Sequence, residues 1–294
     1  MLIVTGATGQ LGRRIVAELL RRVPAQRIGV SVRSPDKAVD LAAQGVRVRQ
    51  GDYDRPDSLR HAWEGAQRLL LISSNAAARG GDPVAHHARA IAVARDLGIE
   101  RIFYTSQISA SPTSLFPPGR DHAATEALLA ASGVAWTALR HGFYAQSLLA
   151  MQAEGLADRA IVAPMDGPVA WTTHDDLAAA DAALLASDRV IDGPTPPLTG
   201  PDALDLAGIA RLVGEVTGTP VSRSFVGLDD LDARAERSGA PAGARAVMQG
   251  YFRAAAAGEF AAIDPTLADM IGRPATTMRA FLARHLPAAA AARC

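Results

Sequence analysis

Cysteine is almost absent from this chain of 294 residues, in which Cys294 is the only one. No disulfide can form within the chain, and this fits a protein that works in the reducing cytoplasm. A run of about 20 apolar residues is absent as well, so no transmembrane helix is expected. The chain begins directly with a short apolar run and a glycine-rich turn, so we expect no signal peptide.

Net charge is also lacking, because 30 Lys and Arg residues balance 30 Asp and Glu residues. This balance gives no support for nucleic acid or an anionic membrane as a partner. Lysine occurs once, at Lys37, so any chemistry that needs a lysine elsewhere in the chain is excluded. The hydrophobic content of 49% is nevertheless enough for a substantial core.

What the chain does have is a glycine-rich turn near its start, with Gly6, Gly9 and Gly12 at intervals of three residues. The apolar run from Leu2 to Val4 before it is typical of a buried parallel strand, and residues 13–22 after it form an amphipathic helix. In such a unit the glycines permit a tight turn, close approach to a diphosphate and close packing of helix on strand. An ordinary turn is the alternative, but the context favours a dinucleotide site.

The end of the second predicted strand, Arg27 to Val32, indicates which dinucleotide binds. An Asp or Glu at this place binds the ribose 2′-OH of NAD, whereas an Arg nearby accommodates the 2′-phosphate of NADP. Here Arg33 stands at the strand end, and Lys37 is close enough to add a second positive charge. A guanidinium suits bidentate contact with phosphate, so NADPH is the predicted cofactor. Solvated surface charges are the alternative interpretation.

The alternation of strand and helix continues along the chain and predicts an α/β fold of the Rossmann type, a doubly wound parallel sheet. Residues 1–144 should form the NADP-binding core, completed by parts of 167–217. Residues 145–166 and 218–294 should form a smaller, mainly helical substrate-binding lobe, and residues 287–294 a loose tail. The expected strands are 2–4, 27–32, 46–50, 68–72, 101–105, 134–139 and 194–199, and the expected helices are 13–22, 36–44, 57–64, 83–97, 145–156, 176–186 and 204–217.

Polar side chains follow several of these strands, at the edge where a doubly wound sheet binds its ligands. Asp52 follows the third strand, where it either contacts the adenine edge or caps the next helix. Residues 73–75 follow the fourth strand, and the small residues 76–82 after them are expected to form a mobile loop over the nicotinamide. His86 and His87 point about 100° apart on the following helix, so one packed and one exposed ring are expected rather than a chelating pair.

Six segments carry a resemblance to a known family: Gly6–Gly12, Val32–Lys37, Leu41–Gly45, Leu69–Ser74, Tyr104–Ser106 and Leu139–Tyr144. They resemble the NmrA-like atypical short-chain dehydrogenases, and most of all the bacterial NAD(P)H:quinone oxidoreductases of type 2. The resemblance implies an NADPH-binding Rossmann domain with the quinone site in a cleft beside a smaller C-terminal lobe. The family also includes NADP-binding regulators that sense redox state without turnover.

The chain departs from the usual chemistry of short-chain dehydrogenases, which pairs a Tyr with a Lys four residues later. Lys37 has no such Tyr before it. His122 and Glu126 occupy the corresponding region and share a helical face, either as an acid–base pair or as a helix-stabilising contact. The resembling quinone oxidoreductases have a Lys where this chain has Ala127. A quinone accepts hydride readily because its product is aromatic, so holding cofactor and acceptor face to face is the main requirement, and no obligatory acid–base residue follows.

Candidate site residues follow from the strand ends and the resemblance. His141 stands where the resembling enzymes usually carry Asn, and either donates a proton or is structural. Phe143 and Tyr144 either stack on a planar acceptor or pack between lobes. The candidate catalytic residues are His141, His122 and Tyr144, and the candidate substrate-binding residues are Gln107, Phe143 and Tyr144. The candidate cofactor-binding residues are Gly6, Thr8, Gly9, Gln10, Leu11, Gly12, Arg33, Lys37, Asp52, Ser73, Ser74, Asn75, Thr105, Ser106, Arg140, His141, Gly142 and Phe143.

No His or Cys spacing in the chain points to a metal site. Two functions therefore remain open. The first is an NADPH-dependent reductase of a quinone or a similar conjugated, planar electrophile. The second is a non-catalytic NADP(H)-sensing regulator. A homodimer is compatible with either function.

Overall fold

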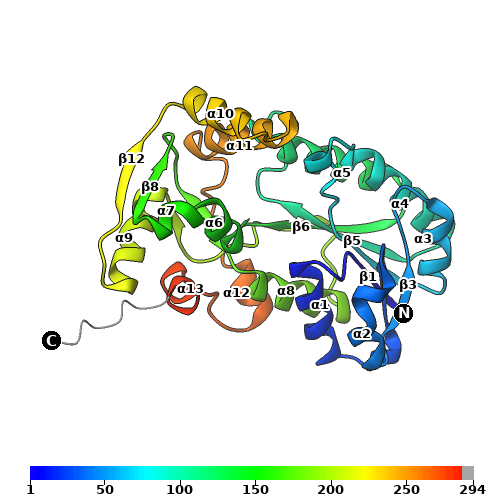
Figure 1. The fold of residues 1–294 in the computed structure, drawn as a ribbon. Helices are drawn as coiled ribbons and strands as arrows, with labels where there is room; N and C mark the ends of the chain where they lie inside the picture. The colour runs from blue at the N-terminus through cyan, green and yellow to red at the C-terminus, as the bar shows by residue number, and fades with distance from the viewer. Residues whose placement is uncertain (287–294) are drawn as a thin grey trace.

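The strands of the computed structural model, which describes residues 1–286 apart from the side chains of residues 78 and 79, form one main sheet (Figure 1). Its seven strands are all parallel and lie in the order β10-β6-β5-β4-β1-β2-β3. The chain builds outward from β1 to β3 and then returns to place β4 on the other side of β1, so the order reverses there. The strands are β1 (Leu2–Thr5), β2 (Ile28–Val32), β3 (Arg47–Gln50), β4 (Arg68–Leu71), β5 (Arg101–Gln107), β6 (Ala135–His141) and β10 (Gly193–Pro194).

Helices cover both faces of this sheet because its strands are apolar on both sides. On one face α1 (Gln10–Leu20), α2 (Val39–Ala43) and α8 (His174–Ala186) pack over a core that includes Ile15 and Leu177. On the other face lie α3 (Pro56–Trp63), α4 (Pro83–Asp96) and α5 (Pro117–Ala131), with Trp63 and Tyr104 in the core. Sheet and helices together are called the sheet lobe below.

A second hydrophobic cluster forms the C-terminal lobe, around Trp171, Tyr251 and Phe260. Short 3₁₀ turns occur in the sheet lobe at η1 (Ala25–Arg27), η2 (Pro35–Ala38) and η3 (Ala76–Arg79). The further helices are α6 (Ala145–Met151), α7 (Ala153–Ala157), α9 (Leu206–Thr217), α10 (Leu228–Arg237), α11 (Ala242–Ala256), α12 (Thr266–Ile271) and α13 (Met278–His285). Two small sheets add β7 (Phe143–Tyr144), β9 (Val169–Thr172) and β11 (Ala203–Leu204), and β8 (Ala160–Ala163) with β12 (Ser222–Phe225).

The predicted fold class is confirmed, but several local predictions are wrong. The expected strand 194–199 is only β10, after which Leu198 forms an isolated bridge with His141. The expected helix 145–156 is broken into α6 and α7 at Gln152. The expected loop 76–82 contains the 3₁₀ turn η3, and its mobility stays a prediction. The C-terminal lobe contains two small sheets that were not expected. The predicted tail lies outside the described residues, and the domain division at residue 144 stays a prediction.

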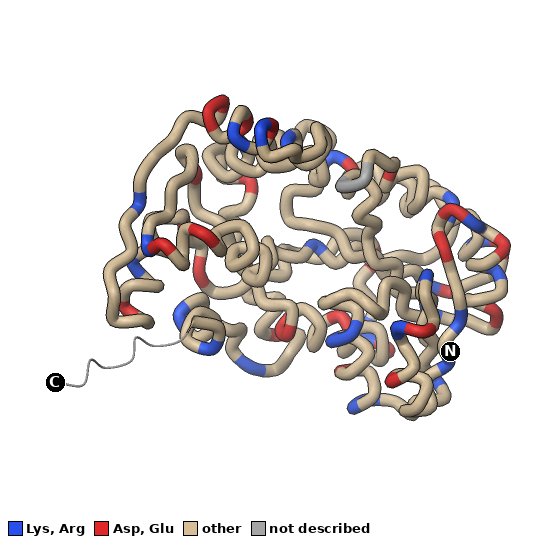
Figure 2. The backbone as a smooth tube through the Cα atoms, in the orientation of Figure 1, with Lys and Arg blue, Asp and Glu red and all other residues tan. Residues whose placement is uncertain are grey.

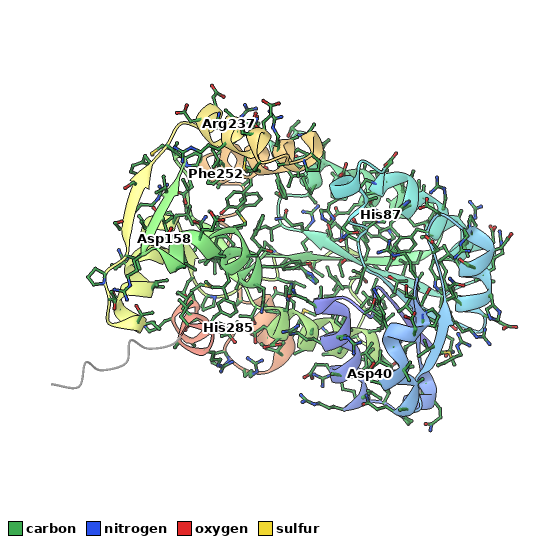
Figure 3. The ribbon with its side chains drawn as sticks, viewed as in Figure 1. Asp40, His87, Asp158, Arg237, Phe252 and His285 are labelled. Atoms are coloured by element: carbon green, nitrogen blue, oxygen red, sulfur yellow. The ribbon has the colours of Figure 1, made fainter. Side chains whose placement is uncertain are left out.

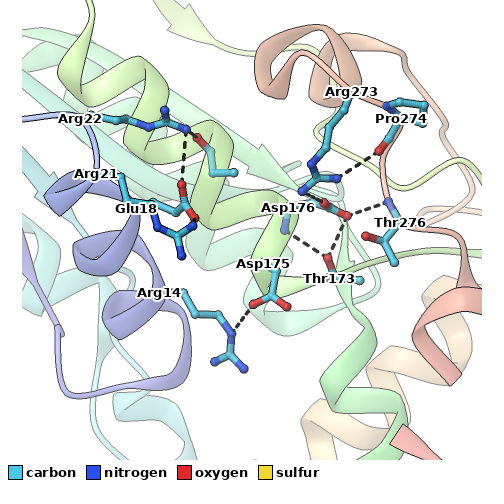
Figure 4. A network of polar contacts seen from close by, with 11 residues as sticks. Arg14, Glu18, Arg21, Arg22, Thr173, Asp175, Asp176, Arg273, Pro274 and Thr276 are labelled. Atoms are coloured by element: carbon cyan, nitrogen blue, oxygen red, sulfur yellow. Dashed lines mark hydrogen bonds and ion pairs between the residues drawn. The ribbon is translucent and has the colours of Figure 1, made fainter. Parts of the chain in front are cut away.

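A polar network joins the segment before α13 to the start of α8 (Figure 4). The buried Asp176 carboxylate accepts hydrogen bonds from the Thr173 hydroxyl at 2.9 Å and the Thr276 amide at 2.8 Å, and pairs with Arg273 at 2.7 Å. Its neighbour Asp175 pairs with Arg14 of α1 at 2.6 Å. The N-terminal ends of α1 and α8 are therefore held side by side.

Candidate cofactor site

The glycine-rich turn has the geometry that a phosphate-binding loop requires. Gly6 has φ +60°, which favours glycine, and its carbonyl accepts the Gly9 N–H at 2.9 Å. A Cβ atom on Gly12 would overlap the Gly6 carbonyl oxygen and lie 2.9 Å from Ala7 Cα, so only glycine allows α1 to pack this close to β1. Helix α1 starts after Gly9 without a side-chain cap, which leaves its first N–H groups for an anion.

A cavity of about 580 Å³ opens at the carboxyl ends of β1 to β4, where the strand order reverses. Of the residues predicted to bind cofactor, Gly6, Thr8, Gly9, Arg33, Asp52, Ser73, Ser74 and Asn75 line it. Tyr53 and His86 also line it and were not predicted. The Tyr53 hydroxyl donates to Thr5 Oγ1 at 2.7 Å and ties the β3 end to β1.

The two cations predicted near the cofactor lie differently. Arg33 lines the cavity and is exposed, and its guanidinium has no hydrogen-bonding or ion-pairing partner within residues 1–286. The Lys37 side chain is exposed and lies outside the cavity lining, while its carbonyl accepts from Arg13 at 2.6 Å. Gln10, Leu11 and Gly12 lie in the first turn of α1 and do not line the cavity.

Two histidines of α4 hold Ser74, in the segment after β4, at the cavity edge. The Ser74 N–H donates to His87 Nε2 at 2.8 Å, and the Ser74 hydroxyl contacts His86 Nδ1 at 2.8 Å. His86 Nε2 lies 3.0 Å from Asp54 Oδ1. The expectation of one exposed ring is wrong. The two rings point in different directions from neighbouring positions of α4, and both contact Ser74, His87 at its backbone N–H and His86 at its hydroxyl. Figure 3 shows His87 within the sheet lobe, where it is 1% exposed.

His87 should make the stability of the protein fall in mild acid. Its Nε2 accepts from Ser74 and its Nδ1 faces the Thr125 hydroxyl at 2.8 Å, and burial lowers the pKa of His87 from 6.5 to about 3. Below pH 6.5 the unfolded chain binds a proton that the folded chain rejects, so the free energy of unfolding decreases by up to about 1.4 kcal/mol per pH unit down to about pH 3. Urea unfolding of native protein and His87→Gln between pH 7 and 4 measures this. A pH dependence that is identical in both proteins would contradict the prediction.

The residues of α5 and the β5 end form two separate contacts. The Tyr104 hydroxyl lies 2.7 Å from His122 Nδ1, and burial lowers the pKa of His122 to about 4. Glu126 accepts the Ser106 hydroxyl at 2.6 Å and pairs in bidentate fashion with Arg140, at 3.1 Å to Nε and 2.7 Å to Nη2. His122 and Glu126 thus have different partners, and within residues 1–286 no hydrogen bond joins them. These contacts support neither of the two alternatives for the pair, acid–base or helix-stabilising.

The segment after β6 lies between the two lobes. His141 is fully buried and contacts Asp181 Oδ1 at 3.0 Å, with the Tyr144 hydroxyl 3.5 Å from its other ring nitrogen. A Cβ on Gly142 would collide with the Ala170 carbonyl, so Gly142 allows β6 to approach β9. Phe143 packs against the rings of Phe116, Trp171, Tyr251 and Phe260.

Two predicted residues of β5 have backbone-anchoring contacts. Thr105 Oγ1 accepts the Ser73 N–H at 2.8 Å and so shapes the cavity edge without lining it. Gln107 Oε1 accepts the Ser109 N–H at 2.8 Å, and Gln107 Nε2 is buried without a partner in the described part of the chain. None of the predicted residues from 105 to 144 lines the cavity. Among the described residues no three His, Cys, Asp or Glu side chains are grouped as a metal site.

Sheet topology, glycine turn and cavity together define a Rossmann protein that binds a nicotinamide dinucleotide. The chain belongs to the NAD(P)H-binding family whose model matches residues 6–185, and it therefore binds NAD(P)H.

Comparison with known proteins confirms the resemblance predicted from the sequence. The chain is 36% identical to quinone oxidoreductase 2 of Escherichia coli, over 95% of this chain and 96% of that protein. It is 27% identical to an NmrA-like family domain-containing oxidoreductase of Aspergillus flavus, over 92% and 90% of the two chains. The crystal structure of the E. coli NADPH-dependent quinone oxidoreductase complexed with NADPH matches with a TM-score of 0.89 at 35% identity, over 97% and 99%. The Citrobacter triphenylmethane reductase complexed with NADP(H) matches with a TM-score of 0.87 at 30% identity, over 97% and 99%.

Proposed function

We propose that the protein is an NADPH-dependent reductase that transfers hydride to a quinone or a similar conjugated, planar acceptor. One observation carries the cofactor part: the uncapped start of α1 and the unpaired Arg33 guanidinium open into the same cavity. A diphosphate and a 2′-phosphate on one adenosine fit these two anion-binding features. The similarity to E. coli quinone oxidoreductase 2 supports the acceptor class.

The residues present fit NADPH, which when bound would supply the hydride. Gly6, Thr8 and Gly9, with the first N–H groups of α1, would hold the diphosphate. Arg33 would hold the 2′-phosphate, and Asp52 with residues 73–75 the adenosine side. Thr105 and the segment 140–144 stand at the ends of β5 and β6, over which the nicotinamide half would extend. We assign Lys37 at most a long-range electrostatic role, since its side chain lies outside the cavity lining.

The acceptor would bind beside β5 and β6, where the two lobes meet. Phe143 and Tyr144 bring aromatic surface to this place, although Phe143 is largely engaged by neighbouring rings. His122 is uncharged near neutral pH because burial lowers its pKa to about 4, so it serves there as a hydrogen-bonding group and not as a cation. A quinone needs no stronger electrophilic assistance, since its reduction product is aromatic.

The proposal is tested by following NADPH oxidation at its absorbance band while several quinones are added to purified protein. We expect NADPH to be oxidised only when a quinone is present, and at a lower rate with NADH at equal concentration. Calorimetric titration of both nucleotides measures binding independently of turnover. Tight NADPH binding without quinone-dependent oxidation would contradict the reductase and favour the NADP(H)-sensing regulator.

The proposal also includes a free small-molecule acceptor, a cytoplasmic location and a domain division near residue 144. Figure 2 shows Lys and Arg interspersed with Asp and Glu along both lobes, which supports a small molecule rather than nucleic acid as the partner. Within residues 1–286 no helix has both the length and the apolarity to span a bilayer. The separate hydrophobic clusters of the two lobes support the domain division. Sedimentation analysis of the purified protein tests whether it forms a homodimer.

A further inference from the structure

A buried contact between an imidazole and a carboxylate lies at the end of β6, outside the lining of the cofactor cavity. His141 is the last residue of β6 and Asp181 lies in the middle of α8, and both side chains are fully shielded from solvent. His141 Nε2 lies 3.0 Å from Asp181 Oδ1. Burying polar side chains costs free energy that apolar side chains of the same volume would not cost. The pair therefore calls for a functional explanation.

The second ring nitrogen of His141 faces the hydroxyl group of Tyr144. Nδ1 lies 3.5 Å from the Tyr144 hydroxyl, and Tyr144 is half-buried, with its ring centroid 4.5 Å from that of His174. Burial raises the pKa of Tyr144, and the Asp181 carboxylate raises it further, so the phenol keeps its proton. Carboxylate, imidazole and phenol thus follow one another from the core outward.

The position of this series relative to the cofactor follows from the sheet. Arg33 would place the adenosine side over the β2 end, so the nicotinamide half would extend over β5 and β6. His141 is the register partner of Gln107 at the end of β5. Tyr144, three residues further, stands where an acceptor beside the nicotinamide would lie.

We propose that Asp181, His141 and Tyr144 form a proton relay that completes reduction of the acceptor; the proposal rests on the function proposed above. Asp181 holds His141 as an imidazolium whose Nδ1–H donates to the Tyr144 oxygen. When the quinone has taken up hydride it is a hydroquinone anion, and its oxygen takes the proton of Tyr144. The Tyr144 O–H bond breaks, the tyrosinate takes the Nδ1 proton of His141, and solvent reprotonates the relay after the hydroquinone leaves.

The neighbouring polar groups are placed less well for this task. His122 has its Nδ1 engaged by Tyr104, and Ser106 donates to Glu126, which Arg140 already neutralises. Burial lowers the pKa of His174 to about 4, although the nearby Asp175 carboxylate acts to raise it, and within the described residues the His174 ring forms no ion pair. Among these groups, His141 is the ring whose nitrogen lies within hydrogen-bonding distance of a buried carboxylate.

The relay predicts a difference between classes of acceptor. A quinone needs one hydride and one proton, and the proton ends on oxygen. A cationic triphenylmethane dye takes hydride at its central carbon and becomes neutral without any proton. Loss of the relay should therefore slow reduction of quinones while leaving reduction of such a dye almost unchanged.

The test compares Tyr144→Phe and the double variant His141→Asn/Asp181→Ala with native protein. The double variant removes both charges together, because removing one would leave the other buried and unpaired. Tyr251→Phe is the matched control, since that buried hydroxyl has no partner in the described part of the chain and belongs to the core of the C-terminal lobe. Each protein is titrated with NADPH by calorimetry, and its single-turnover rate is measured with a benzoquinone and with a cationic triphenylmethane dye.

We expect a benzoquinone rate lowered about 10²-fold in both relay variants, the low end for general acid catalysis, when NADPH is saturating according to the calorimetric titration of each variant. The dye rate and the Tyr251→Phe control should change less than about twofold. ¹⁵N NMR of histidine-labelled native protein should show His141 protonated on both ring nitrogens near pH 7, with one proton lost in Asp181→Asn.

Three results would overturn the relay: a neutral His141 ring in the native spectrum, a benzoquinone rate that Tyr144→Phe leaves unchanged, or equal losses with benzoquinone and dye. Failure of the proposed function looks different, because native protein would then bind NADPH but reduce no quinone. The NMR readout decides on the relay even if native protein does not accept the dye.

Discussion

Replacing Gly12 by alanine is expected to lower the affinity for NADPH about 10²-fold and to destabilise the protein. The added Cβ would overlap the Gly6 carbonyl oxygen and lie 2.9 Å from Ala7 Cα, so α1 must move away from β1 by roughly half an ångström or more. The glycine-rich turn and the first N–H groups of α1 move with it, and misplacement of this order costs binding steeply. Calorimetric titration with NADPH and urea unfolding measure the two effects.

Helix propensity favours alanine at position 12, whereas overpacking disfavours it. The relative size of the two effects decides whether the free energy of unfolding rises or falls. Alanine is favoured over glycine inside a helix by about 1 kcal/mol, whereas overpacking costs about 1–3 kcal/mol. Gly214 of α9 is the matched control, because a Cβ there would meet its nearest neighbour at an ordinary 3.5 Å. Gly214→Ala should stabilise the protein by about 0.5–1 kcal/mol without changing NADPH affinity. Equal behaviour of the two variants would show that close packing at Gly12 is not required.

Local sequence patterns predict the parts of the site that depend on neighbouring residues. The three glycines, the apolar run of β1 and the amphipathic α1 are contiguous, and the backbone geometry they require is found in the turn. Arg33 was predicted from its place at the end of β2, and it lines the cavity. Parallel strands bring their carboxyl ends to one edge, so Asp52 and residues 73–75 could be placed there in advance as well.

Contacts between distant residues could not be predicted in this way. Asp181 lies 40 residues after His141, within an alanine-rich helix whose pattern gives no sign that one position faces β6. The two α4 histidines could be excluded as a chelating pair from their spacing, but their common partner Ser74 depends on how α4 packs beside β4. Helical spacing places Glu126 and His122 on one face of α5, but it cannot show that the Arg140 guanidinium of β6 pairs with Glu126.

Replacing Arg33 by aspartate is expected to change the cofactor preference from NADPH toward NADH. A charge-assisted bidentate contact with phosphate contributes about 1.5–3 kcal/mol, and aspartate adds repulsion of the 2′-phosphate, so NADPH affinity should fall about 10²-fold or more. NADH has no 2′-phosphate and should bind within about threefold of its native affinity, because an aspartate can accept a hydrogen bond from the ribose 2′-OH. Calorimetric titration of both nucleotides gives the ratio of affinities directly.

Arg237→Asp controls for the change in net charge, because Arg237 is an exposed residue of α10 in the C-terminal lobe and does not line the cavity (Figure 3). This control should leave both affinities within about twofold of native at physiological ionic strength, where exposed charges act over about 8 Å. Lys37→Ala separates the two predicted cations: its side chain lies outside the cavity lining, so a loss of less than about threefold for NADPH is expected. Equal losses of NADPH and NADH affinity in Arg33→Asp would mean that Arg33 does not bind the 2′-phosphate. A larger loss in Lys37→Ala than in Arg33→Asp would transfer that role to the only lysine of the chain.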